Sequence, residues 1–445
     1  MTTLPNNSSF TTHLVYILYR LAWFFGMPLI LAYLYKRGRK DPAYWSHLPE
    51  RFGLHRPRQV QHVWIHAVSL GELRSAAPLI NRLLEQGEQI VTTHFTPAGR
   101  TAAHNLFPDA IAQGRLTPVY VPFDYGLAYL RFFKAFQPKY GLVMEIEFWP
   151  GMIRTAKWRG IPLLLCNGQY SQRAFDRDKG KLLSRGRFVS GFHSVMVKSQ
   201  GHAERFQQRG VENIEITGEM RFEQDIPQRL LDAADTFANV LPQHRPVITL
   251  ASVVYDEEDR MIEILGDTLN HFTADDPNRP LFICVPRAPE RFDVVADKLE
   301  GAAINYARRS GILNDQLSGD FPADCDILLG DSLGEMYFYL NLCQLAIVGG
   351  GFGELGSHNI SEPLTLGKPT IIGHGDFFIE FLSHEAIAQG VVKKMSYDDL
   401  QDFLRQGSYQ FSSPADIKAY CDALSGATER TLKALNKRVG TSYGA

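Results

Sequence analysis

The sequence predicts an α/β protein built from two doubly wound domains, and three observations lead to this prediction. Short β-like runs alternate with amphipathic helical stretches from Val63 to Ile372. This alternation stops once, between Pro227 and Pro246, and then resumes. The length of 445 residues suits two domains of about 200 residues better than one. We therefore expect two mostly parallel sheets that face a central cleft, with ligands at the carboxyl ends of the strands.

This pattern divides the chain into an N-terminal segment at 1–40, a first domain at 41–228 and a second domain at 229–445. Strands of the first domain are expected at 63–67, 89–93, 117–121, 140–144, 163–166, 194–197 and 214–217. Strands of the second domain are expected at 247–251, 281–285, 327–329, 345–348 and 370–372. The stretch from Pro227 to Pro246 lacks a β-like run, so we interpret it as the connection between the domains.

Composition and charge narrow the classes of function. Hydrophobic residues make up 45% of the chain and charged residues 21%, the profile of a folded protein with sizeable cores. The net charge of −2 provides no basic field for nucleic acid, so no nucleic-acid partner is expected. The 5 cysteines are widely spaced without a CxxC pair, which argues against a zinc site or a disulfide framework. Asp324-Cys325-Asp326 has the D-x-D form of a metal–diphosphate motif, but it precedes its strand. A solvated turn is expected there, and neither a metal nor a cofactor is predicted.

The N-terminus departs from this soluble profile. Residues 14–35 are apolar over about the length that crosses a bilayer, interrupted only by Arg20 and Pro28. A basic cluster at 36–40 follows at once, while residues 1–12 carry no charged side chain. The positive-inside rule then predicts that the rest of the chain is cytoplasmic. We expect membrane lipid as a partner, with the segment either spanning the bilayer or lying in its interface. A buried hydrophobic helix of the first domain is the alternative.

The stretch at 346–373 organises the second domain. An apolar run ends in Gly349-Gly350-Gly351, a polar loop follows, and a short helix is expected from Ser361 to Gly367 before the next strand. Glycines let the backbone approach a ligand closely, and a helix N-terminus offers free N–H groups to an anion such as phosphate. Glu362, in the first turn, could accept hydrogen bonds from hydroxyls beside that phosphate. A tight turn with a capping carboxylate is the alternative interpretation.

In the first domain, carboxylates directly follow two of the strands. Glu72 is expected in the first helical turn after the first strand, where Gly71 would permit a tight turn. A carboxylate there could act as a general base if burial raises its pKa, or it could simply cap the helix. Glu145 and Glu147 follow the strand at 140–144 and would share one face while the strand lasts. They could form an acid–base pair, or one of them could orient substrate beside a capping carboxylate.

Other polar residues follow strands in both domains. Arg221 follows the last strand of the first domain, near the expected cleft. Arg287 follows the strand at 281–285 and is the natural partner of a phosphate there. Gly334 lies at a turn into a helix after another strand. Together with the glycine triplet, these residues predict a nucleotide site at the carboxyl edge of the second sheet.

Five motifs occur in the order found in a known family: SLGE at 69–72, EIEFWP at 145–150, VPRAPERF at 285–292, GDSLGEM at 330–336 and GGG…HNISEP at 349–363. With the N-terminal anchor, the chain closely resembles the 3-deoxy-D-manno-octulosonic acid (Kdo) transferases of lipid A biosynthesis, from about residue 14 to about residue 400. The resemblance implies an inverting, metal-independent GT-B glycosyltransferase that moves Kdo from CMP-Kdo to a lipid A precursor. It also implies a location at the cytoplasmic face of the inner membrane.

The resemblance further implies roles for individual residues. Glu72 would be the base that deprotonates the acceptor hydroxyl, and Glu147 would orient the acceptor or the base. Ser69 and Arg221 would contact the acceptor, with Arg221 standing where the family has a lysine. The nucleotide would be bound by Arg287, Gly334, Glu335, Met336, Gly350, Asn359 and Glu362.

Besides Arg221, positions in three further segments depart from the family pattern. Ala288 stands where the family has a histidine, and Gln169 stands where it has an arginine. Tyr255 lies in the segment 252–257, where the family has Ser-Thr-His-x-Gly-Glu. These departures leave open a GT-B paralogue with another nucleotide sugar or acceptor, a membrane-anchored binding protein without turnover, and a sugar-nucleotide epimerase of the same fold. Retention of the proposed base and of the main nucleotide contacts favours an enzyme.

Overall fold

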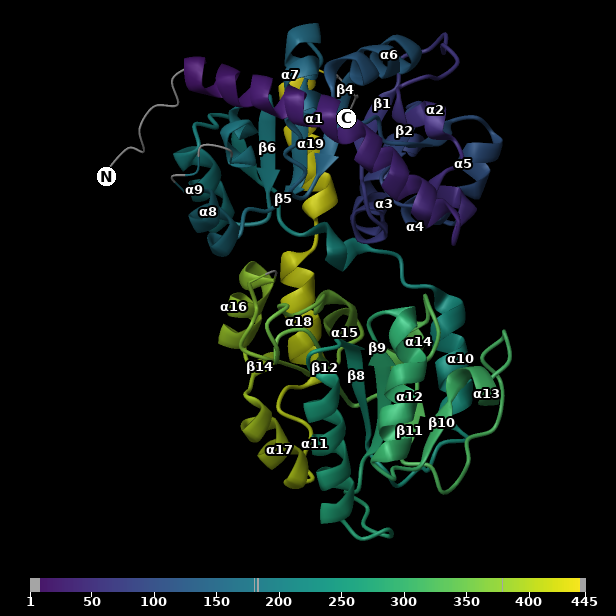
Figure 1. Ribbon diagram of the computed structural model, residues 1–445. Coiled ribbons are helices and arrows are strands. Elements are labelled where there is room, and N and C mark those ends of the chain that lie inside the picture. The colour runs from purple at the N-terminus through teal and green to yellow at the C-terminus, as the bar shows by residue number, and fades with distance from the viewer. Residues whose placement is uncertain (1–8, 180, 182–183, 378, 441–445) are drawn as a thin grey trace. The chain divides into compact units, whose positions relative to one another are not determined.

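A computed structural model of the protein describes residues 9–179, 181, 184–377 and 379–440 (Figure 1). The chain divides into two compact units. The first unit extends to Gln224 and takes up the chain again from Ser425, while the second is Asp225–Leu424. Each unit contains one 7-stranded sheet, and all the strand pairings in both sheets are parallel. The predicted α/β class with two doubly wound sheets is therefore confirmed.

The sheet of the first unit has the strand order β3-β2-β1-β4-β5-β6-β7. Its strands are β1 (Val63–His66), β2 (Ile90–His94), β3 (Leu116–Tyr120), β4 (Tyr140–Met144), β5 (Leu163–Gly168), β6 (Ser194–Val197) and β7 (Ile214–Ile216). Alternate residues of β1 enter different cores, Val63 and Ile65 on one side and Trp64 on the other, because helices cover both faces of the sheet. The strand order reverses between β1 and β4, the place where open α/β sheets bind ligands.

The helices of the first unit connect these strands and cover the sheet (Figure 1). Apart from the N-terminal helix, the α-helices are α2 (Leu48–Arg51), α3 (Leu70–Glu85), α4 (Pro97–Leu106), α5 (Pro108–Ala112), α6 (Gly126–Phe136), α7 (Pro150–Arg159), α8 (Gln172–Asp178), α9 (Gln200–Gln208) and α19 (Ala427–Val439). Short 3-10 helices lie at η1 (Pro42–Tyr44), η2 (Arg185–Arg187), η3 (Val189–Gly191) and η4 (Met220–Glu223).

The N-terminal helix α1 (Ser9–Gly38) is continuous and lies along the first unit (Figure 1). Near its start Val15 is buried in a core cluster of this unit, and near its end Leu34 is also buried. Between them the Tyr19 hydroxyl donates a hydrogen bond of 2.6 Å to Asp124 Oδ2. The contacts are spread over most of the length of the helix, so α1 lies flat on the unit.

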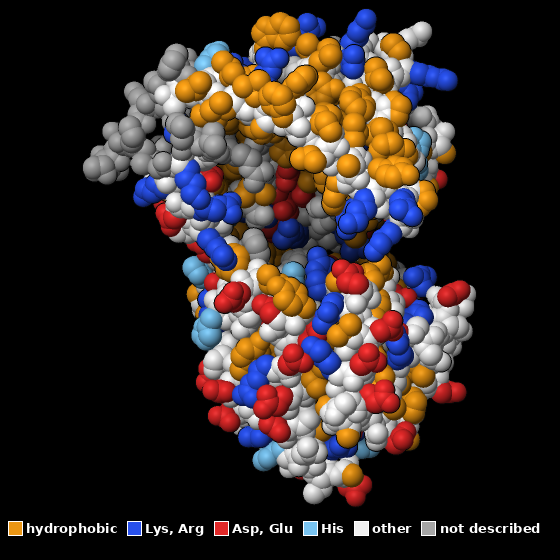
Figure 2. Space-filling view, in the orientation of Figure 1, with side chains coloured by type: hydrophobic (Ala, Val, Ile, Leu, Met, Phe, Trp, Pro, Cys, Tyr) orange, Lys and Arg blue, Asp and Glu red, His pale blue; other side chains and the backbone are white. Residues whose placement is uncertain are grey.

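The other faces of α1 expose large hydrophobic side chains, which gather on this side of the first unit (Figure 2). Phe24, Phe25 and Leu29 are 75%, 72% and 74% exposed. Among the described residues, one helical segment, Thr11–Gly38, is both long enough and apolar enough to cross a membrane. Only 6% of its most apolar window is buried. The alternative of a buried core helix is therefore wrong.

The sheet of the second unit has the strand order β10-β11-β9-β8-β12-β13-β14. Its strands are β8 (Val247–Val253), β9 (Leu281–Pro286), β10 (Tyr306–Arg308), β11 (Ile327–Leu329), β12 (Leu345–Val348), β13 (Thr370–Ile372) and β14 (Val392–Lys394). Its helices are α10 (Gln228–Ala238), α11 (Glu258–His271), η5 (Pro289–Arg291), α12 (Phe292–Gly301), α13 (Arg309–Ile312), α14 (Met336–Leu342), α15 (Ser361–Thr365), α16 (Glu380–Ala388), α17 (Tyr397–Arg405) and α18 (Pro414–Leu424). Here the order reverses between β8 and β12, so the loops after these two strands are neighbours.

Three features differ from the sequence-based expectation. Helix α19 packs on the first unit, where Leu432 and Leu435 join the core cluster of β1, so the second unit ends at Leu424 and not at the C-terminus. The stretch between Pro227 and Pro246, interpreted as a connection, contains the helix α10, which packs against α14. Strands β10 and β14 were not predicted, because each is a three-residue strand at a sheet edge with little apolar sequence.

Candidate active site

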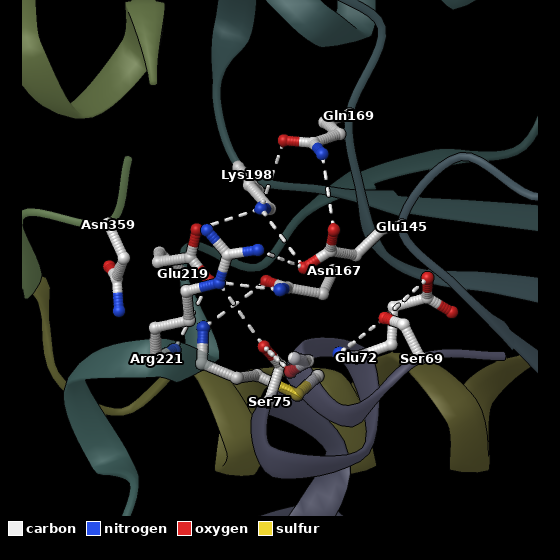
Figure 3. Close-up of polar contacts among 12 residues, drawn as sticks. Ser69, Glu72, Ser75, Glu145, Asn167, Gln169, Lys198, Glu219, Arg221 and Asn359 are labelled. Carbon is white, nitrogen blue, oxygen red and sulfur yellow. Dashed lines mark hydrogen bonds and ion pairs between the residues drawn. The ribbon is translucent and has the colours of Figure 1, made fainter. Parts of the chain in front are cut away.

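Glu72 lies in the first turn of α3, directly after β1. Ser69 caps this helix: its Oγ accepts a hydrogen bond of 3.3 Å from the Glu72 N–H and donates one of 3.1 Å to Glu72 Oε1 (Figure 3). The Val68 N–H donates to Glu72 Oε2 at 2.8 Å. The carboxylate is thus held by the turn that starts the helix. This turn does not require glycine at position 71, because Gly71 has no left-handed φ and a Cβ there would meet nothing within 4 Å.

The electrostatic surroundings of Glu72 favour its protonated form. Its side chain is buried, with a relative exposure of 8%. Burial raises the pKa of Glu72 to about 8, and the neighbouring carboxylates of Glu147 and Glu145 act in the same direction. The hydrogen bonds from Val68 and Ser69 lower this pKa and offset the rise only in part. A carboxylate with such a pKa can take a proton from a substrate hydroxyl near neutral pH.

Glu145 follows the end of β4 and is fixed by two side chains. Because β4 ends at Met144 and Glu145 has a φ of +57°, the expected alternation with Glu147 along a strand does not occur. Glu145 Oε1 accepts a hydrogen bond of 2.6 Å from Arg221 Nη2. Its Oε2 accepts one of 3.2 Å from Gln169 Nε2. Glu145 is therefore a paired carboxylate beside Glu72.

Two cations, Lys198 and Arg221, form ion pairs with the buried carboxylates near Glu72 (Figure 3). Arg221 Nε donates to Ser75 Oγ at 3.3 Å, on the same helix as Glu72. Lys198, which is buried after β6, lies 2.8 Å from Glu219 Oε2 and 3.8 Å from Glu145 Oε1. Burial alone would raise the pKa of Glu219, but the charges of Lys198 and Arg221 lower it to about 2. Both Glu145 and Glu219 are consequently held by cations in a nearly water-free cluster.

Glu147 lies two residues further along the same turn. Its side chain is half-buried, and its Oε2 accepts a hydrogen bond from Trp149 Nε1. The Trp149 ring packs edge-on against His66 at the end of β1, with 5.1 Å between the ring centroids. Glu147 also contributes to the raised pKa of Glu72, so the two carboxylates are close enough to interact. The structure brings Ser69, Glu72, Glu147 and Arg221 to the carboxyl edge of one sheet, as predicted.

The predicted nucleotide residues lie in the second unit, where Arg287 follows β9. Its side chain is exposed, and among the described residues it makes no hydrogen bond or ion pair. Burial lowers the pKa of the nearby His358 to about 4, and the charge of Arg287 adds to this effect. His358 is therefore neutral beside a cation that can bind an anionic ligand.

The turn before α14 has the predicted form, although one of its side chains has an internal partner. Gly334 has a φ of +82°, which favours glycine, and α14 begins at Met336. The carboxylate of Glu335 accepts two hydrogen bonds, of 2.8 and 2.7 Å, from the guanidinium of Arg309. Glu335 thus stabilises the loop, and its carboxylate is already paired within the protein.

The residues that follow the glycine triplet form a single helical turn. Gly350 has a φ of +93°, and the 5-residue helix α15 begins at Ser361. Asn359 Oδ1 accepts hydrogen bonds from the Ser361 N–H at 3.0 Å and from its hydroxyl at 2.7 Å. The first N–H group of α15 therefore already has a partner within the protein. Glu362 lies half-buried in this turn, at the predicted position.

The described part of the chain contains no group of three or more histidine, cysteine, aspartate or glutamate side chains that could hold a metal ion. The D-x-D sequence is a solvated turn only at its start, because Asp324 is exposed in a turn whereas Asp326 is not exposed. Asp326 is largely buried and accepts a hydrogen bond of 2.8 Å from Arg245 Nη2. Arg279 Nη1 lies 2.8 Å from the same oxygen. Asp326 is thus part of a structural ion-pair cluster.

Comparison with known proteins assigns the chain to a family. Residues 46–224 match the family described as 3-deoxy-D-manno-octulosonic-acid transferase (kdotransferase). The 3-deoxy-D-manno-octulosonic acid transferase of Bordetella pertussis is 35% identical over 424 residues, which cover 93% of this chain and 97% of that protein. The chain belongs to the Kdo transferase family. The 3-deoxy-D-manno-octulosonic acid transferase of Haemophilus influenzae is 32% identical to this Kdo transferase homologue over 382 residues. The matched region covers 84% of this chain and 85% of the Haemophilus protein.

Solved structures show the same fold. A UDP-N-acetylglucosamine 2-epimerase aligns with a TM-score of 0.55 at 13% identity, over 87% of this chain and 98% of its own. A glycosyltransferase from Rickettsia africae aligns with a TM-score of 0.55 at 10% identity, over 86% of this chain and 100% of its own. The two seven-stranded parallel sheets and these neighbours identify the fold as GT-B, and membership of the Kdo transferase family makes the protein a glycosyltransferase.

Three buried charged residues of this Kdo transferase homologue were not assigned a role from its sequence. Lys198 and Glu219 form the ion pair described above, and Glu257 contacts the glycine loop of the second unit. A position directly after a buried strand is a usable signal for Lys198, which follows Val197 at the end of β6. Its partners come from other strands, and a local sequence pattern does not show which charges meet.

Proposed function

We propose that this Kdo transferase homologue moves Kdo from CMP-Kdo to a hydroxyl of a lipid A precursor with inversion, and that Glu72 is the general base. The main support is the buried carboxylate of Glu72, whose pKa is raised to about 8 at the carboxyl end of β1. Deprotonated Glu72 would accept the proton of the acceptor hydroxyl as its oxygen attacks the anomeric carbon. The bond from that carbon to the CMP oxygen breaks on the opposite face, which inverts the configuration.

Donor binding is assigned to the second unit. Departure of CMP leaves oxocarbenium character on the sugar and negative charge on the phosphate, so a fixed cation near the phosphate lowers the barrier. Arg287 is the proposed partner, because it is exposed after β9 and has no partner among the described residues. Gly334, Met336, Gly350, Asn359 and Glu362 are proposed to surround the rest of the nucleotide sugar. Glu335 is proposed to act indirectly, since Arg309 already binds its carboxylate.

Acceptor binding is assigned to the first unit. Arg221 is proposed to keep Glu145 in place and to contact the acceptor, and Glu147 is proposed to orient the acceptor hydroxyl toward Glu72. The hydrogen bonds from Arg221 to Glu145 and to Ser75 support the first of these roles. Ser69 is proposed to hold the base and to line the acceptor site, since its hydroxyl donates to Glu72.

We also propose that α1 keeps the enzyme at the cytoplasmic face of the inner membrane and lies in the plane of the interface. Its packing on the first unit from Val15 to Leu34 supports this orientation, because a helix that spanned the bilayer would have to give up these contacts. Its exposed apolar side chains would enter the hydrocarbon region, and the exposed basic residues at 36–40 would face anionic head groups.

The decisive experiment incubates membranes containing the protein with CMP-Kdo and a tetra-acylated lipid A precursor, and identifies the products by mass spectrometry. We expect a mass increase of one or more Kdo residues with the wild-type protein and none with Glu72→Gln. Absence of any Kdo adduct with folded wild-type protein would refute the proposed activity. Transfer from a different nucleotide sugar in the same assay would refute the proposed donor.

A further inference from the structure

The glycine loop of the second unit, defined here as residues 349–356, surrounds a carboxylate of the protein itself. The side chain of Glu257 is completely buried, at a relative exposure of 0%. Its Oε2 accepts a hydrogen bond of 2.7 Å from the Gly350 N–H. Its Oε1 accepts bonds of 2.8 Å from the Phe352 N–H and 3.1 Å from the Gly353 N–H. One carboxylate therefore satisfies three backbone donors of the loop.

Three N–H groups of the loop converge on one anionic group, as they do in sites that bind an external anion. Gly350 has a φ of +93°, and N–H groups that converge in this way form an anion-binding nest. A Cβ at Gly349 would lie 2.9 Å from Glu257 Oε2 and 2.6 Å from the Ser252 carbonyl oxygen. The glycine at this position is therefore explained by close approach to the β8–α11 turn, without any ligand.

The neighbouring residue reinforces this contact. Asp256 Oδ2 accepts a hydrogen bond of 3.0 Å from the Glu354 N–H, and a Cβ at Gly353 would lie 2.5 Å from the same oxygen. Two successive carboxylates that precede α11 thus bind four N–H groups of the glycine loop. The glycine loop is therefore held by the segment that follows β8, at residues that precede Asn359 and Glu362 in the chain.

We propose that Glu257 is a positioning residue of the donor site: it fills the anion nest of the glycine loop and thereby sets the loop for the nucleotide sugar. It follows that the donor phosphate is bound by side chains such as Arg287 and not by the N–H groups at 350, 352 and 353. This second statement rests on the proposed function. The placement of the loop by Glu257 does not.

Amide hydrogen exchange of the loop tests the placement without any nucleotide. We expect the amides of Gly350, Phe352 and Gly353 to be protected in the wild-type protein and to exchange at least about tenfold faster in Glu257→Gln. The glutamine keeps the size of the side chain, but its NH₂ group faces backbone donors. Asp326→Asn is the matched control. It also weakens a buried carboxylate cluster of the second unit, but that cluster lies just before β11 and not at the glycine loop. Equal exchange in wild type and Glu257→Gln would overturn the proposal.

Calorimetric titration with CMP, cytidine and inorganic phosphate tests the role in binding. We expect Glu257→Ala to bind CMP about 10- to 100-fold more weakly than the wild type, the range for lost charge-assisted hydrogen bonds. Sodium formate should restore much of this affinity, because its carboxylate can enter the vacated nest, whereas sodium chloride at equal ionic strength should not. If Glu257→Ala does not fold, Glu257→Gln replaces it in the titration and should also bind CMP more weakly.

The outcomes separate the two proposals. CMP or phosphate that binds Glu257→Ala as tightly as, or more tightly than, the wild type would overturn the inference, because the emptied nest would then be a phosphate site. Wild-type protein that binds no CMP would refute the proposed donor, while the exchange rates would still decide whether Glu257 places the loop.

Discussion

Arg221 Nη2 lies 2.6 Å from Glu145 Oε1, and Nε of the same guanidinium donates to Ser75 Oγ at 3.3 Å. One planar side chain thus connects the turn after β4 with the helix that carries Glu72. The pairing fixes the buried Glu145 carboxylate beside Glu72, and the negative charge of Glu145 helps to raise the pKa of Glu72. Glu145 is consequently a poor candidate for the base itself, because its charge is already neutralised by Arg221.

The rate of Kdo transfer should rise with pH through about 8. The base must be deprotonated to accept a proton, and the pKa of Glu72 is raised to about 8 by burial and by Glu147 and Glu145. We therefore expect kcat/KM to increase up to this pH and then to level off, as measured by product mass spectrometry over a pH series. A rate that is constant from about pH 5 to about pH 9 would contradict a base with this pKa.

The substitution Glu145→Gln should move this pH profile toward lower pH. It removes one of the two negative charges that raise the pKa of Glu72 and leaves the positive charge of Arg221 without its partner. Both changes favour the ionised form of Glu72, so the midpoint should fall even if the plateau rate also falls. Glu85→Gln is the matched control: Glu85 ends the same helix α3 and is exposed there, so its loss should leave the midpoint unchanged.

Much of this architecture could be predicted from the sequence, for identifiable reasons. The central strands are continuous apolar runs because helices bury both faces of a parallel sheet, so β1, β4, β8 and β12 were readily located. Glu72 could be singled out because it directly follows such a run. The short edge strands β10 and β14 lack that signal.

Contacts between distant segments could not be predicted in the same way. The amphipathic pattern of α19 indicates a helix, but nothing in it shows that the helix packs on the first unit. The pairing of Lys198 with Glu219 and the burial of Glu257 under the glycine loop depend on which strands are neighbours. The sequence suggested that the glycine triplet lets the backbone approach a nucleotide closely, whereas in the structure the N–H groups at 350, 352 and 353 bind a carboxylate of the protein itself.

The substitution Arg287→Ala should weaken CMP binding by about 1.5–3 kcal/mol, the range for a lost hydrogen bond to a charged group. Binding of cytidine, which lacks the phosphate, should change little, so the ratio of the two affinities isolates the phosphate contact. CMP binding should persist in EDTA, because the described residues contain no cluster of metal ligands. Calorimetry that shows equal loss for CMP and cytidine, or complete dependence on a divalent metal, would contradict this assignment.

Replacing Phe24, Phe25 and Leu29 together by serine should release the protein from membranes into the soluble fraction. These side chains are exposed on α1, and burying each in an apolar phase is worth about 1.5–3 kcal/mol. The wild-type protein should stay membrane-bound in high salt, since salt screens charges but not apolar insertion. Val240→Ser, which changes an exposed apolar residue of the second unit, is the control and should remain bound. Wild-type protein that washes off in salt alone would show that α1 does not enter the bilayer.

The substitution Glu72→Gln should abolish transfer while the protein stays folded. It keeps the size of the side chain and an oxygen for the Val68 N–H, but it removes the proton acceptor, a loss that usually costs about 10²–10⁴-fold in rate. If Glu72 only capped α3, the same change would cost a few tenths of a kcal/mol of stability, about the size of a helix-dipole contact, and would leave turnover nearly intact.

Stability measurements on the same variant make the test independent of the assay. Folded Glu72 holds its proton up to a pKa of about 8, whereas in the unfolded chain the carboxyl has its ordinary pKa of 4.5. Between these values the folded state binds more protons, so the free energy of unfolding of the wild type falls as pH rises through this window. Glutamine does not titrate, and the melting temperature of Glu72→Gln relative to wild type should therefore increase from about pH 5 to about pH 9. A variant that shows this increase but keeps the wild-type rate would mean that Glu72 is buried as described and is not the base. The base would then be sought at Glu147, since Arg221 already pairs with Glu145.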